Sequence, residues 1–115
     1  MNTCEEIVST YIKCFHFTNI VELCELDDFH SWQKYLDKSI HLLYINKILI
    51  SDDFRKTIVL WDKKIMQGGM IILKGGLEED IKAELKSNPI IKANYIYGTY
   101  FQENLTILYK KFNNL

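Results

Sequence analysis

Three segments of this sequence carry apolar side chains on both faces of the strands that they predict. Segment 57–61 is β-branched and aromatic, 70–73 is a run of Met, Ile and Leu, and 91–101 is rich in tyrosine. An antiparallel sheet with one face in water would alternate apolar and polar residues along each strand. We therefore expect a sheet with both faces covered.

Glycine and proline mark the boundaries between these segments. Gln67-Gly68-Gly69 predicts a turn that joins the first two strands into a hairpin over 56–74. After Gly75-Gly76, apolar residues at three- and four-residue spacing predict a helix from Leu77, which Pro89 closes at about Ser87.

The remaining segments are predicted from their periodicity. Helical spacing predicts one helix over 4–16, a second from Phe29 to about Leu49, and a short terminal helix within 105–112. Segment 19–26 fits either a strand or a helical turn, and we favour the strand.

The order of these elements over 20–101 is β-α-β-β-α-β, which predicts a ferredoxin-like α+β fold in a single domain, 1–115. An N-terminal helix precedes it and a short C-terminal helix or tail follows. Two helices cover only one face of a four-stranded sheet, so a second copy or the terminal segments must cover the other. We favour a homodimer through the sheet face. A cone-shaped NTF2-like domain is the alternative fold.

The charge and hydropathy of the chain exclude several classes of function. Its 115 residues carry 14 basic and 15 acidic side chains, a balance that offers no bulk field to nucleic acid. No apolar run approaches the ~20 residues of a membrane helix. The N-terminus is acidic where a signal peptide would be basic. We expect a soluble, cytoplasmic protein that binds neither nucleic acid nor membrane.

The cysteines and histidines give no metal signature. Cys4, Cys14 and Cys24 are ten residues apart, which matches no zinc pattern. His30 follows Asp27-Asp28, a cluster that is more typical of helix capping than of a metal site. We expect no metal and no organic cofactor.

From His41 onward the chain resembles the YCII-like proteins, members of the dimeric α+β barrel group. The similarity covers about 38–101 and lies in His41-Leu42-Leu43-Tyr44-Ile45, in Gly68-Gly69-Met70-Ile71-Ile72-Leu73, in Leu77-Glu78-Glu79 and in Asn88-Pro89-Ile90-Ile91-Lys92-Ala93. Asn88 replaces the family's usual Asp, and Asn94 stands where the family has Gly.

This resemblance implies an acid–base pair. The family's proposed histidine matches His41, and Asp62 is the residue nearest to its proposed aspartate. A carboxylate beside an imidazole fixes the tautomer and stabilises the protonated ring. The structural alternative makes His41 a half-buried helix residue and Asp62 a solvated charge at a strand end.

Aromatic residues indicate where a ligand would bind. Aromatic strands are typical of a core or a dimer interface, but if a ligand pocket exists we expect it between helices and sheet, lined by Trp32, Trp61, Tyr95 and Tyr97, with a small, partly apolar molecule as its ligand. The alternative function is a non-enzymatic interaction protein, such as an immunity protein or antitoxin. Its acidic residues would then meet a basic partner: Glu22, Glu25, Asp27, Asp28, Asp52 and Asp53.

Overall fold

The computed structural model describes residues 20–23, 32–46, 50–75 and 78–112. The described elements follow in the order β1 (Ile20–Leu23), β2 (Ile40–Ile45), α2 (Ser51–Trp61), the 3₁₀ helix η2 (Asp62–Lys64), β3 (Ile65–Lys74), α3 (Glu79–Ser87), α4 (Pro89–Asn94), β4 (Tyr95–Tyr100) and β5 (Leu105–Lys110). The predicted α+β class is confirmed. The helix predicted over 4–16, the three cysteines and the His30 cluster lie outside the described residues.

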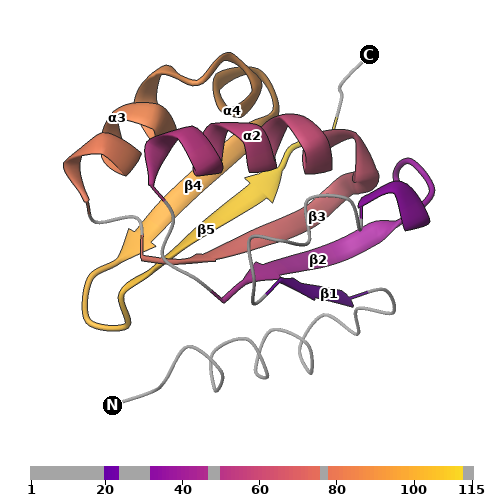
Figure 1. Ribbon diagram of the computed structural model, residues 1–115, viewed down its shortest axis with the longest axis horizontal. Coiled ribbons are helices and arrows are strands. Elements are labelled where there is room, and N and C mark those ends of the chain that lie inside the picture. The colour runs from indigo at the N-terminus through magenta and orange to yellow at the C-terminus, as the bar shows by residue number, and fades with distance from the viewer. Residues whose placement is uncertain (1–19, 24–31, 47–49, 76–77, 113–115) are drawn as a thin grey trace.

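The strands form one mixed sheet in the order β1-β2-β3-β5-β4. Neighbours among β1, β2 and β3 run parallel, whereas β5 runs antiparallel to both β3 and β4. Figure 1 shows α2, α3 and α4 together on one side of this sheet. Along the chain, two strands precede α2, and two helices separate β3 from the hairpin of β4 and β5. The predicted order β-α-β-β-α-β is therefore not the order of the described elements.

The strand predicted within 19–26 is present as β1, but the helix predicted from Phe29 to Leu49 is wrong. Its described part contains a single 3₁₀ turn and then β2. Five of the six β2 residues are buried, on both faces, as is usual for a strand that lies between two parallel neighbours. Leu36, which the helical spacing placed on the buried face, is 80% exposed.

The strand predicted over 57–61 is also wrong, because these residues form the second half of α2. Along the whole of α2 the buried side chains recur at i, i+3, i+4 and i+7: Phe54, Thr57, Ile58 and Trp61. Asp52 and Asp53 lie in the first turn, where carboxylates complement the helix dipole. Helical periodicity therefore prevails over the β propensity of the last five residues.

The strand predicted over 70–73 is confirmed within β3, but the hairpin over 56–74 is not. Gln67-Gly68-Gly69 lies inside β3, where the pairing with β2 shifts register between Ile40 and Leu42. Gly68 has φ +83°, and a Cβ on Gly69 would lie 2.9 Å from the Met66 carbonyl oxygen. These glycines form a bulge rather than a turn.

The C-terminal half follows the prediction in part. The helix predicted over 77–87 is confirmed as α3. Asn88 caps the next helix, α4, by accepting the N–H groups of Ile90 and Ile91, so the predicted strand begins only at Tyr95. The predicted terminal helix is instead β5, which a turn with Asn104 at φ +53° joins to β4.

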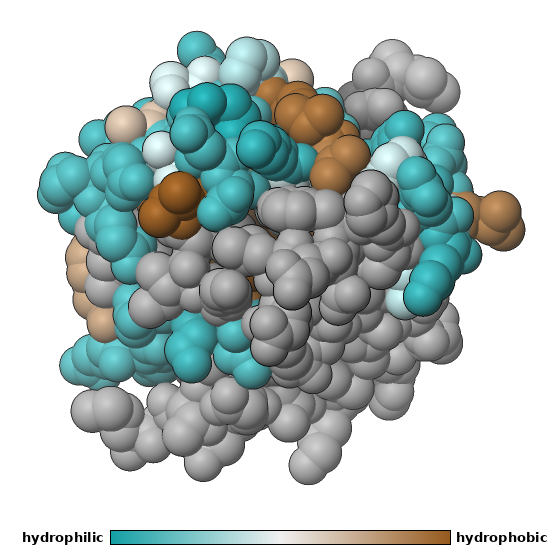
Figure 2. Space-filling view, viewed as in Figure 1, coloured by the Kyte–Doolittle hydropathy of each residue, from teal (hydrophilic) through white to brown (hydrophobic). Residues whose placement is uncertain are grey.

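Both faces of the sheet are buried over β2, β3 and β5, but β4 is mostly exposed, so the predicted burial holds for segment 70–73 and not for the strand within 91–101. The face under the helices holds one apolar cluster, centred on Phe54, Trp61 and Ile71. The opposite face holds a second cluster, which is at most 7% exposed: Leu42, Tyr44, Met70, Ile72, Leu105 and Ile107. Over β2, β3 and β5 this burial occurs within one chain, whereas Ile96 and Tyr100 of β4 stay exposed, and the homodimer through the sheet face stays a prediction. The surface over the helices is mostly hydrophilic, with separate hydrophobic groups (Figure 2).

Candidate functional site

The outer backbone edge of β4, which we name the β4 edge, is an unpaired edge of the described sheet. Among the described strands β4 pairs with β5 alone, so alternate N–H and C=O groups of Tyr95–Tyr100 face away from the sheet. Ile96 is 60% exposed and Tyr100 is 46% exposed. The strand thus combines unpaired backbone groups with large exposed apolar side chains.

The β4 edge lacks the usual protection of an edge strand. Proteins protect such strands with lysine, proline or inward-pointing charges. The run from Tyr95 to Phe101 contains no charged residue and no proline. Gly98 has open space where its side chain would lie, since an added Cβ would meet nothing within 4 Å. Nothing on this strand itself opposes pairing with another strand.

A small hollow lies between helix α3 and the β4 edge, and we name it the α3–β4 hollow. Its volume is about 170 Å³, and it is lined by Lys82, Leu85, Lys86, Tyr97, Thr99 and Phe101. Lys82 Nζ lies 6.0 Å from the Phe101 ring centroid and 3.7 Å from the exposed Glu79 carboxylate. The hollow therefore has apolar walls and two lysine side chains along one side.

The two predicted acid–base residues lie in different elements, His41 in β2 and Asp62 in η2. The Asp62 carboxylate accepts hydrogen bonds from Tyr95 Oη at 2.7 Å and from Asn94 Nδ2 at 3.4 Å. Lys110 Nζ lies 3.3 Å from the same carboxylate and donates to the Asp62 and Ile65 carbonyls. Asp62 is thus the centre of a polar cluster that joins η2 to α4, β4 and β5.

The environment of Tyr95 keeps its hydroxyl neutral. Burial raises the pKa of Tyr95 far above its ordinary value, and the adjacent Asp62 carboxylate raises it further. A neutral phenol is a hydrogen-bond donor, which is the role that it has toward Asp62. The sequence placed Tyr95 in a ligand pocket, whereas the structure gives its hydroxyl a partner within the fold.

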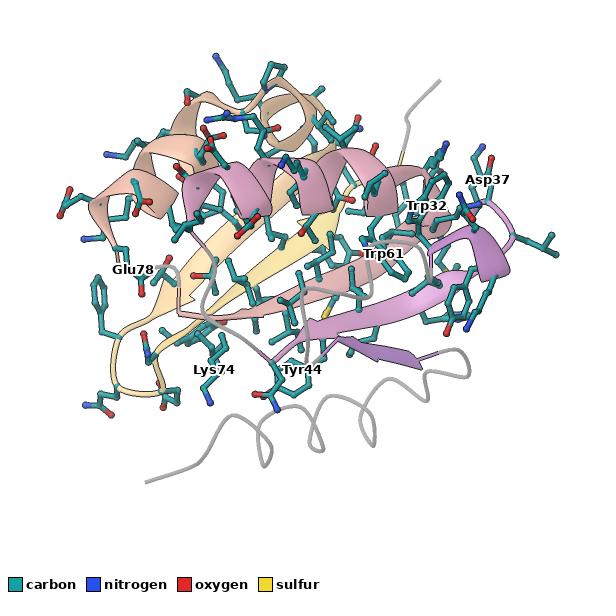
Figure 3. The ribbon with its side chains drawn as sticks, in the orientation of Figure 1. Trp32, Asp37, Tyr44, Trp61, Lys74 and Glu78 are labelled. Atoms are coloured by element: carbon teal, nitrogen blue, oxygen red, sulfur yellow. The ribbon has the colours of Figure 1, made fainter. Side chains whose placement is uncertain are left out.

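The four predicted pocket residues have different surroundings. Trp61 and Tyr95 are buried in the core at 0% and 5% exposure, so a ligand would reach them only by displacing core packing. Tyr97 lines the α3–β4 hollow. Figure 3 shows Trp61 between α2 and the sheet, and Trp32 at the end of the molecule near Asp37.

Trp32 packs against lysines that follow α2. The ammonium groups of Lys63 and Lys64 lie 4.8 and 5.4 Å from its ring centroid, within cation–π range. Lys64 also donates to the Tyr35 carbonyl at 2.7 Å and pairs with Asp37 at 2.9 Å, which lowers the pKa of Asp37. These contacts fasten segment 32–39 to η2.

A shallow groove runs along the outer side of α2. One part, of about 420 Å³, is lined by Arg55, Lys56, Val59 and Leu60. A second part, of about 330 Å³, extends from Arg55 and Val59 to α3 and α4. Arg55, the sequence's single arginine, donates from Nε to Glu84 at 3.1 Å and from Nη1 to Asp52 at 3.3 Å.

The predicted acidic surface is described only in part. Asp52 and Asp53 lie in the first turn of α2, and Asp52 pairs with Arg55. Glu22 lies in β1, and Glu25, Asp27 and Asp28 lie outside the described residues.

No group of three or more histidine, cysteine, aspartate or glutamate side chains within the described residues is arranged to hold a metal ion. None of the helices described here is long and apolar enough to cross a membrane.

No protein-family model matches this chain, and no curated protein matches it either.

Sequence reasoning missed the β4 edge as a site. Its residues were assigned to a strand, but strand order is not encoded in local pattern, so an edge strand and a central strand looked alike. The signal that could have indicated it is the uncharged, tyrosine-rich run from Tyr95 to Phe101.

Proposed function

We propose that this protein is an interaction module that accepts an extended segment of a partner protein along the β4 edge. The observation that carries the proposal is the exposed, uncharged strand β4, which pairs on only one side within the described sheet. A partner strand would satisfy the free backbone groups of β4 and cover the exposed Ile96 and Tyr100 side chains. This corresponds to the interaction-protein alternative, of which immunity proteins and antitoxins are examples.

The remaining surroundings of β4 support this role. The Tyr95–Asp62 hydrogen bond and the full register with β5 hold the strand in place. A fixed edge pairs with less loss of conformational entropy than a flexible one. The polar cluster around Asp62 then has a structural role in positioning the site.

The test is an NMR titration of the whole protein with the capped peptide acetyl-Thr-Gln-Val-Gln-Thr-Gln-Val-amide. We expect the largest amide shifts and new exchange protection at residues 95–100. A peptide N-methylated at two adjacent central residues, which blocks both of its edges, should lose this binding. Failure of the unmethylated peptide to perturb β4 at millimolar concentration would overturn the proposal.

The solution mass of the protein provides a second test. Light scattering over a dilution series should give a mass near 13.6 kDa. A stable species of twice that mass whose β4 amides are already protected would show that a second copy occupies the edge. The homodimer through the sheet face, which the apolar strands of the sequence favour, would give twice the mass with β4 amides unprotected.

Binding of a small, partly apolar molecule is the second candidate function, and the groove along α2 favours it. Its volume lies within the range of about 300–1,000 Å³ that is typical of ligand sites. Val59, which is 56% exposed, would contact the apolar part of the ligand, and Arg55 a polar group. Loss of a measured ligand affinity in Val59→Asp, with an unchanged fold, would support this candidate.

The acid–base pair stays a prediction within this second candidate. If His41 acts on a bound molecule, His41→Ala should abolish the measured affinity or activity while the fold is retained. An unaffected variant would show that His41 has no role in binding or catalysis.

A further inference from the structure

The α3–β4 hollow lies beside the strand that we propose as the docking edge. Tyr97 and Thr99, which line the hollow, have the same parity in β4 as the buried Tyr95. They therefore belong to the helix-covered face, and Ile96 and Tyr100 to the opposite face. A strand that pairs with β4 would likewise direct every second side chain to the helix-covered face, next to the hollow.

The size of the hollow fits one side chain. At about 170 Å³ it is smaller than the ~300–1,000 Å³ that pockets for whole small molecules occupy. Leu85, Tyr97 and Phe101 provide apolar walls for the stem of such a side chain. The hollow would thus act as a specificity pocket beside a backbone that pairs without regard to sequence.

The charges of the hollow determine the chemistry of that side chain. Lys82 and Lys86 are one helical turn apart on α3, and both line the hollow. Lys82 pairs only with the highly exposed Glu79, at 3.7 Å, and Lys86 has no ion pair within the part of the chain that the structure describes. A carboxylate in the hollow would therefore lie beside two positively charged side chains.

We infer that the partner segment accepted by β4 is acidic: an extended strand with a carboxylate side chain, best a glutamate, in the α3–β4 hollow and apolar side chains over Ile96 and Tyr100. This inference rests on the proposed function and names the partner's chemistry. The partner alternates acidic and apolar residues, because the α3 lysines lie on the helix-covered side of β4 and the apolar Ile96 and Tyr100 on the opposite side.

The same charges disfavour a second copy at this edge. Two β4 strands paired antiparallel around a two-fold axis would place both α3 helices on the same face of the joined sheet. The lysines of both copies would then approach each other, and like charges brought together at an interface are unfavourable. An acidic partner offsets the charge that a second copy would double.

The experiment compares three capped peptides that differ only at alternate positions. Acetyl-Thr-Glu-Val-Glu-Thr-Glu-Val-amide should bind roughly three- to tenfold more tightly than the glutamine peptide, the expected gain from one or two exposed ion pairs. The corresponding lysine peptide should bind more weakly than both. The advantage of the glutamate peptide should disappear at about 1 M salt.

A pair of charge-matched variants assigns the effect to the hollow. Lys82→Gln with Lys86→Gln should remove the advantage that the glutamate peptide has over the glutamine peptide. The control, Lys34→Gln with Lys56→Gln, removes the same charge elsewhere and should retain most of the advantage.

The outcomes separate this inference from the proposed function. If the glutamine peptide binds at β4 and the glutamate peptide binds no better, the acidic partner is excluded while the docking edge stands. If no peptide perturbs β4, the docking edge itself is excluded. An equal loss in both double variants would mean that net charge, not the hollow, attracts the peptide.

Discussion

Tyr95 donates its hydroxyl hydrogen to Asp62 at 2.7 Å across 33 residues of sequence. The bond ties the first residue of β4 to the 3₁₀ turn that follows α2. Lys110, from the neighbouring strand β5, reaches the same aspartate. One polar cluster thus fixes the start of the strand that we propose as the docking edge, and its members can be tested singly.

Tyr95→Phe should destabilise the protein by about 2 kcal/mol, because a largely buried carboxylate loses a hydrogen-bond donor. Urea unfolding at pH 7 measures the difference. Tyr97→Phe, at an exposed position of the same strand, is the control and should change the stability by less than about 0.5 kcal/mol. Equal effects of the two substitutions would contradict the role given to the Asp62 bond.

The raised pKa of Tyr95 predicts that the free energy of unfolding decreases at alkaline pH. The folded state raises the pKa of Tyr95 above its ordinary value of 10.0, so folding favours the neutral phenol. This contribution is complete below pH 10 and is lost as the pH rises further, because the unfolded chain ionises first. The stability difference between wild type and Tyr95→Phe should therefore shrink above pH 10, as thermal unfolding from pH 8 to 11.5 would show.

Lys110→Met should be more damaging than Tyr95→Phe. It keeps the apolar stem but leaves the Asp62 carboxylate and the Asp62 and Ile65 carbonyls without their ammonium donor. Breaking one side of a buried ion pair costs about 3 kcal/mol or more. Lys111→Met, at the next residue, is the matched control. A cost for Lys110→Met no greater than that of the control would show that the cluster contributes little.

Gly69→Ala should be far more destabilising than Gly98→Ala. A Cβ at Gly69 would lie 2.9 Å from the Met66 carbonyl oxygen and 3.1 Å from that of His41, so backbone must move. The bulge of β3 would shift, at a cost of about 1–3 kcal/mol. Gly98 has open space, and alanine there should be neutral. Chemical denaturation of both variants gives the comparison, and similar midpoints would contradict the bulge.

Glu84→Gln should reduce the acid sensitivity of the protein. Hydrogen bonds from Arg55 lower the pKa of Glu84 below its ordinary value of 4.5, and Asn88 adds to the effect. The stabilisation is therefore complete above pH 4.5 and is lost as the pH falls through the folded pKa. Wild type should be more stable than the variant at pH 7, and the two should converge near pH 3. Glu79→Gln, at an exposed carboxylate, should show no such convergence.

The sequence by itself determined the elements whose local signals agree with one another. In α3 the spacing of Ile81 and Leu85, the acidic first turn and the proline beyond its end all predict a helix, and it is present. The apolar run 70–73 predicted a buried strand, which lies in the C-terminal half of β3. The apolar residues on both faces of 70–73 likewise predicted burial on both sides, which this part of β3 has.

Local signals failed where two periodicities overlap. Residues 57–61 have strong β propensity, but they complete a helical stripe that begins at Phe54, and burial of that stripe against the sheet decides the outcome. Residues 40–45 and 105–110 fitted helical spacing, yet in both segments adjacent residues are buried on opposite faces of the sheet. Which faces are covered is a property of the whole fold.

The candidate site depended most on tertiary structure. The sequence identified Asp62 and Tyr95 as residues of interest, but only the fold brought them together and gave each a structural partner. The order β1-β2-β3-β5-β4 places β4 at an edge and α3 beside it. Strand order is set by long-range pairing and packing, which no window of neighbouring residues contains. The sequence therefore determined an uncharged, aromatic strand, and only the tertiary structure decided that one edge of it is unpaired within the described sheet.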